Sequence, residues 1–362
     1  MSGSPSDLRD VANWRLATQG LSSPRFEGAA GVVSFFGAVQ AQDHGPAKWS
    51  LGLRTTGRTE SEVEGDYGEG RIVRTHALRP TWHYLAPEDL RWVQGLTAGR
   101  VHAQNDIHYR KLALDAATLN HCHAIIQRAL AGGNHLTRQE IRERLAAEGV
   151  DAEGQRLAYI MMHAELDLLV CSGSPRSRHT YALVDEWVEP VSSMDAEDAL
   201  ARLTLTYFRS HGPSTDRDFS WWSSLRLSEV RAGMAMVADR LQQREFDGVT
   251  YTWAERPPAE TSSRPRVNLI QVLDEYVVGY RESRSAIDID AHHREWRESG
   301  GRYDPLILDG QIAGTWRRRQ TAATLRAEIS LAIALSEPQL DALREEAERL
   351  AGFFGQELEL VL

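Results

Sequence analysis

Apolar residues at three- and four-residue spacing predict helices in the first forty positions of the chain. One helix is expected from Leu8 to Thr18 and a second from about Arg25 to Val39. The buried stripe of the second helix consists of Phe26, Ala30, Val33 and Phe36. Gln40 would continue this stripe, and a primary amide facing a core needs partners for two donors and an acceptor. Gln40 is therefore either hydrogen-bonded structure or part of a site.

A second amide follows where this helical pattern stops. If the chain extends after Val39, Gln40 and Gln42 point the same way, because side chains two residues apart share a face in extended backbone and diverge in a helix. Asp43-His44-Gly45-Pro46 then predicts a turn. The two amides are thus expected to lie together on one loop.

The pattern that follows predicts a helix and a hairpin. A short helix is expected from Trp49 to Leu53, and residues 71–77 and 81–85 have the composition of two strands, broken at Arg79-Pro80. Helices followed by such a hairpin are typical of a winged helix-turn-helix unit.

A second unit with the same order has clearer boundaries. Thr137-Arg138-Gln139-Glu140 is a capping box that opens a helix, and Gly149 ends this helix. A longer helix carries Leu157, Ile160, Met161, Ala164 and Leu168 on one face. A basic turn with Arg176 and Arg178 then precedes a strand over residues 180–184.

A third unit is predicted after residue 190, and short strands after residue 266. The third unit has helical patterns around residues 200–207, 219–225 and 228–241 and a strand at 249–254. The later strands are expected at residues 267–273, 276–280, 306–308, 312–316, 325–330 and 357–362, with a helix from Ser336 to Leu350. The predicted fold is therefore α+β, with three tandem winged helix-turn-helix units followed by a small β-barrel. The corresponding domains are residues 1–100, 101–190, 191–256 and 257–362.

Three motifs carry a resemblance to a known family. Gln40-Ala41-Gln42-Asp43, Trp49-Ser50-Leu51 and residues 78–85, Leu-Arg-Pro-Thr-Trp-His-Tyr-Leu, resemble the winged-helix DNA glycosylases of the AlkZ/YcaQ superfamily. The resemblance covers nearly the whole chain. It implies a catalytic loop of Gln, an apolar residue, and Gln or Asp; the Gln-x-Gln form is similar to the AlkZ branch, which protects antibiotic producers by unhooking interstrand crosslinks. The YcaQ-like branch has an acid at the position of Gln42, and His44 stands where the AlkZ-like loop often has proline.

Two glutamines as catalysts would restrict the substrate. Glycosidases usually use two carboxylates, one of which protonates the leaving group, and amides cannot do this. An N7-alkylated purine is already cationic and leaves as a neutral base. Gln42 would then hold the water and Gln40 would face the sugar cation. The residues alone favour a structural role, in which both amides cap the preceding helix, whereas the resemblance favours catalysis.

Further candidates support or compete with the amides. Asp43 could deprotonate water or cap the turn. His83, beside Arg79, could orient a phosphate, support the glutamines or be a packed residue. His121-Cys122-His123 and His292-His293 lack a second ligand pair at zinc spacing, so neither a metal nor a cofactor is expected.

The charge pattern bears on the partner. The net charge is −10, but nucleic-acid binding needs only a local basic face. All 41 basic residues except Lys48 and Lys111 are arginine, which leaves almost no nucleophile for Schiff-base chemistry. The best phosphate contacts are Arg317, Arg318 and Arg319, followed by Arg176 and Arg178, although charge runs are commonly just solvated. Residues 274–281 resemble the barrel block of the family, which is expected to address the minor-groove side.

The expected partner is double-stranded DNA with N7-alkylpurine lesions or crosslinks. A base tied to the opposite strand cannot swing out freely, so an open, C-shaped protein is predicted. With neither a secretory start nor a membrane span, the chain is expected in the cytoplasm near the nucleoid, with Cys122 and Cys171 buried. The alternative function is a transcription regulator without chemistry, but Glu153, Glu165 and Asp167 make the longer helix of the second unit a poor major-groove reader.

Overall fold

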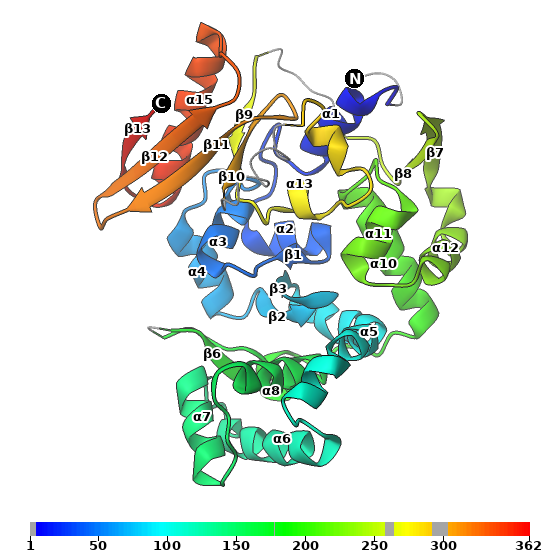
Figure 1. Cartoon of the computed structure of the whole chain (residues 1–362), viewed down its shortest axis with the longest axis vertical. Helices are drawn as coiled ribbons and strands as arrows, with labels where there is room; N and C mark the ends of the chain where they lie inside the picture. The colour runs from blue at the N-terminus through cyan, green and yellow to red at the C-terminus, as the bar shows by residue number, and fades with distance from the viewer. Residues whose placement is uncertain (1–4, 177, 258–263, 292–302) are drawn as a thin grey trace.

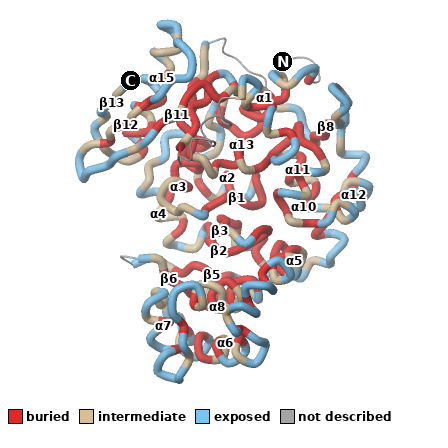
Figure 2. The backbone as a smooth tube through the Cα atoms, viewed as in Figure 1, coloured by how far each residue is buried: buried red, intermediate tan, exposed pale blue. Residues whose placement is uncertain are grey.

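Helices alternate with small sheets in the computed structural model, which describes residues 5–176, 178–257, 264–291 and 303–362. Figure 1 shows this mixed α/β arrangement, and Figure 2 shows how the buried segments run through its interior. None of the helices in these ranges is both long and apolar enough to cross a membrane.

The first part of the chain contains a three-stranded sheet. Its elements are α1 (Leu8–Thr18), α2 (Ala29–Phe36), β1 (Val39–Gln40), α3 (His44–Gly52), α4 (Glu60–Gly68), β2 (Val73–Ala77) and β3 (Arg79–Leu85). The strands are antiparallel, in the order β1-β3-β2. Helix α1 has the predicted bounds. Helix α2 is shorter than predicted because Gly37 adopts a φ of 75° and ends it.

Two local predictions in this part are wrong. Helix α3 begins at His44, so Pro46 lies in a first helical turn, where a missing N–H costs no intrahelical hydrogen bond. The hairpin turns at Leu78, which has a φ of 60°, and Arg79 already belongs to β3. Arg79 is therefore a residue of the strand that pairs with β1.

The second part has a long helix and a further three-stranded sheet. Its elements are η1 (Pro87–Asp89), α5 (Leu90–Lys111), α6 (Ala116–Leu130), β4 (Leu136–Thr137), α7 (Arg138–Ala147), α8 (Gly154–Leu166), β5 (Val170–Ser172), β6 (Thr180–Leu183) and α9 (Val184–Trp187). The predicted capping box is confirmed: Glu140 N donates to Thr137 Oγ1 at 3.3 Å, and Thr137 N donates to Glu140 Oε2 at 2.7 Å. The strand order is β4-β6-β5.

The third part repeats this order of elements. It comprises α10 (Ala196–Ser210), α11 (Asp216–Ser223), α12 (Leu227–Met236), η2 (Ala238–Arg240), β7 (Gln242–Phe246) and β8 (Val249–Trp253). The predicted helix over residues 228–241 ends early, and the residues beyond it form β7, which pairs with β8. An isolated bridge between Ser214 and Thr252 occupies the place that β1 and β4 have in the other sheets. We propose that all three parts are winged helix-turn-helix units.

The last part is a half-barrel sheet with a helix packed against it. It comprises β9 (Val267–Leu269), α13 (Glu275–Val278), η3 (Arg284–Ile287), β10 (Asp304–Leu308), β11 (Gln311–Gln320), β12 (Thr324–Leu331), α15 (Glu337–Phe353) and β13 (Glu357–Val361). The strand order is β13-β12-β11-β10-β9. The strand predicted for residues 276–280 is wrong, because the Asp274 side chain accepts from Tyr276 N at 2.9 Å and caps α13.

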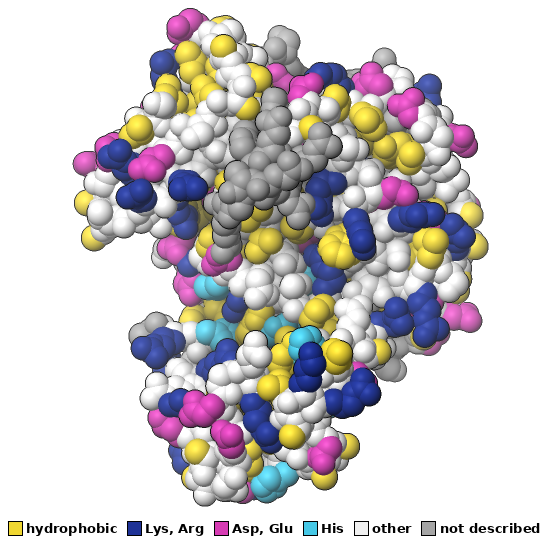
Figure 3. Space-filling model, viewed as in Figure 1, with side chains coloured by type: hydrophobic (Ala, Val, Ile, Leu, Met, Phe, Trp, Pro, Cys, Tyr) yellow, Lys and Arg dark blue, Asp and Glu magenta, His cyan; other side chains and the backbone are white. Residues whose placement is uncertain are grey.

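The two ends of the chain share one hydrophobic core. Residues of α1, α2 and α3 pack in a single cluster with the half-barrel sheet and α15. The Trp49 indole donates to the carbonyl of Leu269 at 2.6 Å across this contact. A separate core lies among α6, α7 and α8, which form the lower lobe in Figure 1. The outline is open on one side between this lobe and the β11–β12 hairpin, and Figure 3 shows the opening as a notch.

Candidate active site

Strand pairing brings Gln40 to the polar side chains of β3. Gln40 lies opposite His83 in the antiparallel pair β1–β3. Arg79, Thr81 and His83 alternate along β3 and therefore share a face of the sheet. Three of the predicted site residues, Gln40, Arg79 and His83, thus lie together.

The side-chain amide of Gln40 is fixed by hydrogen bonds to its oxygen. Gln40 Oε1 accepts from Arg79 Nη2 at 3.1 Å and from Thr81 Oγ1 at 3.4 Å, and the residue is 4% exposed. Its backbone N–H donates to Glu275 Oε1 at 2.6 Å. Within the described ranges, no protein group bonds to the amide nitrogen of Gln40. Because Gln40 also lines a cleft, this nitrogen is available to a molecule bound there.

Glu275 is a buried carboxylate behind Gln40. It also accepts from the indole Nε1 of Trp222 at 3.0 Å and lies 3.2 Å from His211 Nε2. Burial opposes its ionisation, but the hydrogen bond and charge of His211 and the charge of Arg79 outweigh burial and lower its pKa to about 2. Glu275 was not among the site residues predicted from the sequence. An acid within the apolar stretch after Asp274 is the signal that could have found it, since glutamates are rarely buried unless paired.

His83 is a buried neutral imidazole. It is 0% exposed, and its Nδ1 lies 3.0 Å from the carbonyl oxygen of Thr81. Burial and the charge of Arg79 lower its pKa to about 3, so it is uncharged at pH 7. Of the three roles considered for His83, the burial fits a packed residue or a support for Gln40, because an imidazole without exposed surface cannot reach a phosphate.

We expect His83 to make the protein sensitive to acid. Its pKa is about 6.5 when unfolded and about 3 when folded, so the unfolded state binds more protons between these values. The contribution of His83 to the free energy of unfolding is complete above pH 6.5. It falls as the pH drops towards 3, by up to about 1.4 kcal/mol per pH unit. Urea unfolding from pH 7 to 4 should give a shallower slope for His83→Asn than for the unmodified protein. Equal slopes would contradict this assignment.

Gln42 and Asp43 lie outside the cleft lining. Gln42 is exposed, and its Oε1 accepts from Trp82 N at 3.0 Å. Asp43 precedes α3, but its side chain makes no capping hydrogen bond. His44 lies 2.8 Å from the Tyr84 hydroxyl through Nδ1. The two glutamines therefore contact β3 at different residues, and of the two only Gln40 lines the cleft.

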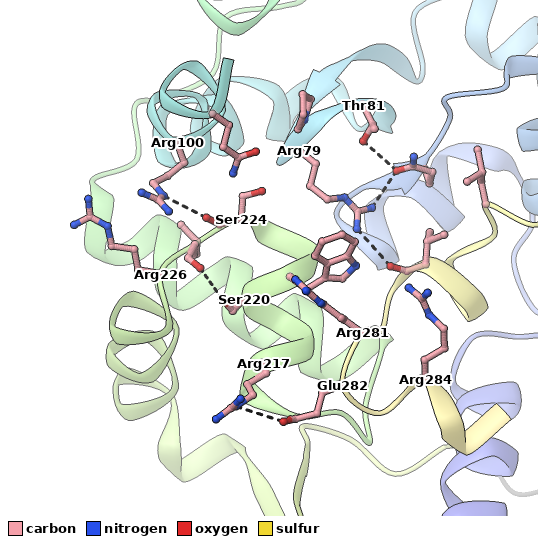
Figure 4. Close-up of a pocket in the computed structure, with 17 residues that line it drawn as sticks. Arg79, Thr81, Arg100, Arg217, Ser220, Ser224, Arg226, Arg281, Glu282 and Arg284 are labelled. Atoms are coloured by element: carbon pink, nitrogen blue, oxygen red, sulfur yellow. Dashed lines mark hydrogen bonds and ion pairs between the residues drawn. The ribbon is translucent and has the colours of Figure 1, made fainter. Parts of the chain in front are cut away.

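The cleft has a volume of about 1100 Å³ and an excess of positive charge (Figure 4). Its walls come from β3, α5, α11 and the segment after α13. The arginines that line it are Arg79, Arg100, Arg217, Arg226, Arg281 and Arg284. Glu282 is the acidic residue among the described lining residues, and it pairs with Arg217 at 3.4 Å. A protein with a net charge of −10 thus has a basic cleft suited to a polyanion.

Trp221 is an aromatic side chain on the wall of this cleft. It is 38% exposed, whereas the adjacent Trp222 is fully buried. The guanidinium carbons of Arg281 and Arg79 lie 4.9 Å and 5.7 Å from its ring centroid. Trp221 was not among the site residues predicted from the sequence, although neighbouring residues on a helix face different directions. Arginines around an exposed aromatic ring are typical of nucleic-acid contacts.

The predicted phosphate contacts lie outside the cleft. Arg317 and Arg319 are exposed on β11, but Arg318 points to the other face, with its guanidinium carbon 4.3 Å from the Phe354 ring centroid. Arg319 lies 3.4 Å from Glu328. The three arginines therefore do not form one surface. In Figure 3, dark blue side chains gather on this hairpin and, separately, between α5 and α11.

The basic turn of the second part is partly engaged by the protein itself. Arg176 donates to Glu140 Oε2 at 2.6 Å and to the carbonyl of His135 at 2.8 Å, while Arg178 is exposed. Cys122 and Cys171 are free and buried, as predicted. His292-His293 lies outside the described residues.

Known proteins provide a direct comparison for this arrangement. A family model for AlkZ-like DNA glycosylases matches residues 33–353, which include Gln40 and the whole cleft lining. The chain belongs to the AlkZ-like DNA glycosylase family. It is similar to the interstrand DNA cross-link repair glycosylase of Streptomyces sahachiroi, with 23% identity over 330 residues that cover 85% of this chain and 87% of that protein. The solved structure of Streptomyces sahachiroi DNA glycosylase AlkZ has a TM-score of 0.78 at 21% identity and covers 99% of this chain and 100% of that chain.

Membership of the AlkZ-like family makes this chain an enzyme that acts on N-glycosyl bonds. The alternative of a regulator without chemistry is therefore set aside. Glu165, counted above among the acidic residues against major-groove binding, is not a surface charge, because it is fully buried and bonded to His76.

Proposed function

We propose that this protein is a monofunctional DNA glycosylase for cationic N7-alkylated purines, including bulky adducts and interstrand crosslinks. The observation that carries the proposal is the state of the titratable groups around Gln40. Glu275 is ionised and His83 is neutral at pH 7, so neither can protonate a leaving base. A base that departs from such a site must already be activated, as an N7-alkylpurine is.

The arrangement supports a division of roles between the amides. Gln40 lines the cleft with the ionised Glu275 behind it, and negative charge there would stabilise an oxocarbenium-like sugar. Gln42 would hold the attacking water. In the free protein, Arg79 donates a hydrogen bond to the side-chain oxygen of Gln40. We propose that, when DNA binds, Arg79 gives up this bond and contacts a DNA phosphate instead. Asp43 would take no part in this step.

The surroundings of Lys48 support a monofunctional enzyme. A lyase would need an amine that forms a Schiff base with the sugar. Lys48 is 8% exposed, is bonded to Glu60, and donates to Glu64 at 2.7 Å. The two carboxylates thus engage the ammonium group of Lys48, which has little exposed surface from which to reach a sugar.

Reaction with defined duplexes tests the function. One duplex carries N7-methylguanine and the other a nitrogen-mustard crosslink between guanines. The expected result is release of the base with strands that break only after alkali treatment. Retention of both adducts at high enzyme excess would overturn the proposal, and scission before alkali treatment would overturn the monofunctional part.

A role in self-resistance to a DNA-alkylating natural product is part of the proposal. The Gln-Ala-Gln form of the loop, and the similarity to a cross-link repair glycosylase, support it. Deleting the gene should sensitise the host to a crosslinking agent more than to methyl methanesulfonate. Equal sensitisation to both agents would favour general alkylation repair.

We expect Trp221→Ala to weaken binding to lesion-containing duplex by roughly tenfold or more, because a stacked base contributes about 1–3 kcal/mol. Fluorescence anisotropy measures this affinity. Ile107→Ala is a matched control, since Ile107 is 50% exposed on α5 but does not line the cleft. Trp221→Phe should retain most of the affinity, and equal affinities for all four proteins would exclude stacking.

A further inference from the structure

Three histidines from three helices, and an aspartate at the end of one of these helices, meet outside the cleft. His102 lies on α5, His123 on α6 and His163 on α8, and Asp167 follows α8. His102 Nε2 is 3.0 Å from Asp167 Oδ1, and His163 Nδ1 is 3.1 Å from Asp167 Oδ2. His163 Nδ1 is also 3.3 Å from His123 Nε2. Four side chains thus direct ligand-type atoms at one another.

These separations fit the edges of a metal coordination sphere. Zn²⁺ binds imidazole nitrogen and carboxylate oxygen at about 2.0–2.2 Å, so neighbouring ligands of a tetrahedral ion lie roughly 3.3 Å apart. The ligand atoms of His102, His163 and Asp167 all lie within 4.8 Å of one another. His123, with Nδ1 3.8 Å from Asp167 Oδ2, is placed to become the fourth ligand after a small ring movement.

A fifth side chain orients the first of these ligands. The hydroxyl of Tyr109 lies 3.2 Å from His102 Nδ1. A proton on Nδ1 that is donated to this hydroxyl leaves the lone pair of Nε2 directed at Asp167. Outer hydrogen bonds of this kind fix the tautomer of metal-binding histidines.

We propose that His102, His123, His163 and Asp167 bind a divalent transition-metal ion of the Zn²⁺ type. The ion would be structural. Arg100 and Gln104 line the cleft and each lie two residues from His102, and positions two apart on a helix differ in direction by about 200°. The cluster therefore lies on the face of α5 away from the cleft, and the ion would clamp α5 to α6 and α8.

The pattern of the sequence did not predict this site. His121-Cys122-His123 has no second ligand pair at zinc spacing, so a metal was not expected from the sequence. The other ligands come from helices that begin 26 residues earlier and 38 residues later than α6, so spacing along the chain cannot show them. His121 itself is exposed, and the cluster does not include it.

Zn²⁺ titration of the full chain tests the proposal. The protein is stripped with a chelator, and Zn²⁺ binding is followed by calorimetry and by thermal unfolding. We expect one ion per chain and a higher unfolding temperature with Zn²⁺. Asp167→Asn should abolish both effects, and Tyr109→Phe should weaken binding by roughly tenfold or more. The matched control His121→Ala, on the same helix as His123, should behave like the unmodified protein.

Two results would overturn the site. One is the absence of saturable binding by the unmodified protein. The other is unchanged binding by both Asp167→Asn and His102→Gln, with circular dichroism of the metal-free forms confirming that they are folded. If Asp167→Asn fails to fold, His102→Gln decides alone, because His102 is partly exposed at the helix surface. Metal binding and thermal unfolding do not depend on base excision, so these experiments test the metal site independently of the proposed function.

Discussion

Replacing Gln40 with alanine is expected to slow base excision by at least about a hundredfold, the usual cost of removing one positioned polar group that acts on the reacting centre. Duplex affinity should stay close to that of the unmodified protein. The reason is that Gln40 is 4% exposed and offers the cleft little more than its amide, whereas the surrounding arginines carry the charge that attracts DNA.

Single-turnover excision of N7-methylguanine, with enzyme in excess, measures this effect without a contribution from product release. Gln104→Ala is the matched control, because Gln104 also lines the cleft but lies on α5, away from β1. Unchanged excision by Gln40→Ala would remove Gln40 from the mechanism. If the excision rate and the DNA affinity of Gln40→Ala fall by the same factor, Gln40 contributes to binding and not to the chemical step.

The same assay applied to Gln42→Ala tests the proposed water-holding role. Gln42 is bonded to Trp82 N through its oxygen, so its loss leaves one backbone N–H without this partner but removes no cleft wall. We expect excision to fall while affinity is kept. Full activity of this variant would assign the water to Gln40 alone.

The second large effect is expected at a buried ion pair. Asp274→Asn should destabilise the protein by about 3–5 kcal/mol, because it leaves the Arg54 guanidinium buried without its counter-charge. Arg54 Nη1 and Nη2 donate to the two carboxylate oxygens of Asp274 at 2.8 and 2.7 Å, and the side chains are 2% and 0% exposed.

Urea unfolding monitored by tryptophan fluorescence measures this loss. The comparison variant is Asp341→Asn, which breaks the exposed pair between Asp341 and Arg344. An exposed pair contributes about 1 kcal/mol or less, so this variant should unfold close to the unmodified midpoint. Equal midpoints for both variants would show that water reaches the Arg54–Asp274 pair.

The parts of the fold that the sequence predicted well are those governed by neighbouring residues. The capping box of Thr137 and Glu140 sets the start of α7 through bonds between residues three apart. The strand predicted for residues 276–280 failed because its apolar pattern fits either type of element, and the Asp274 cap decides for a helical turn. Local spacing could not separate these two outcomes.

The candidate site was predictable only in part, for a related reason. Gln40 could be found because an amide continues an apolar stripe. Glu275 and Trp221 come to Gln40 from positions about 180 to 235 residues away, and only the tertiary fold brings them there. Arg317, Arg318 and Arg319 illustrate the opposite error, since a run of one residue type on a strand is divided between two faces.

The core shared by the two ends of the chain also orders events during synthesis. Domains usually fold as they leave the ribosome, beginning with the N-terminal one. Here α1, α2 and α3 lack part of their shared core until β9 to β12 and α15 have been translated, and the Glu275 carboxylate behind Gln40 is translated after β9. A nascent chain that ends before β9 therefore lacks both this core and Glu275, so the proposed site around Gln40 cannot assemble until the C-terminal part has been translated.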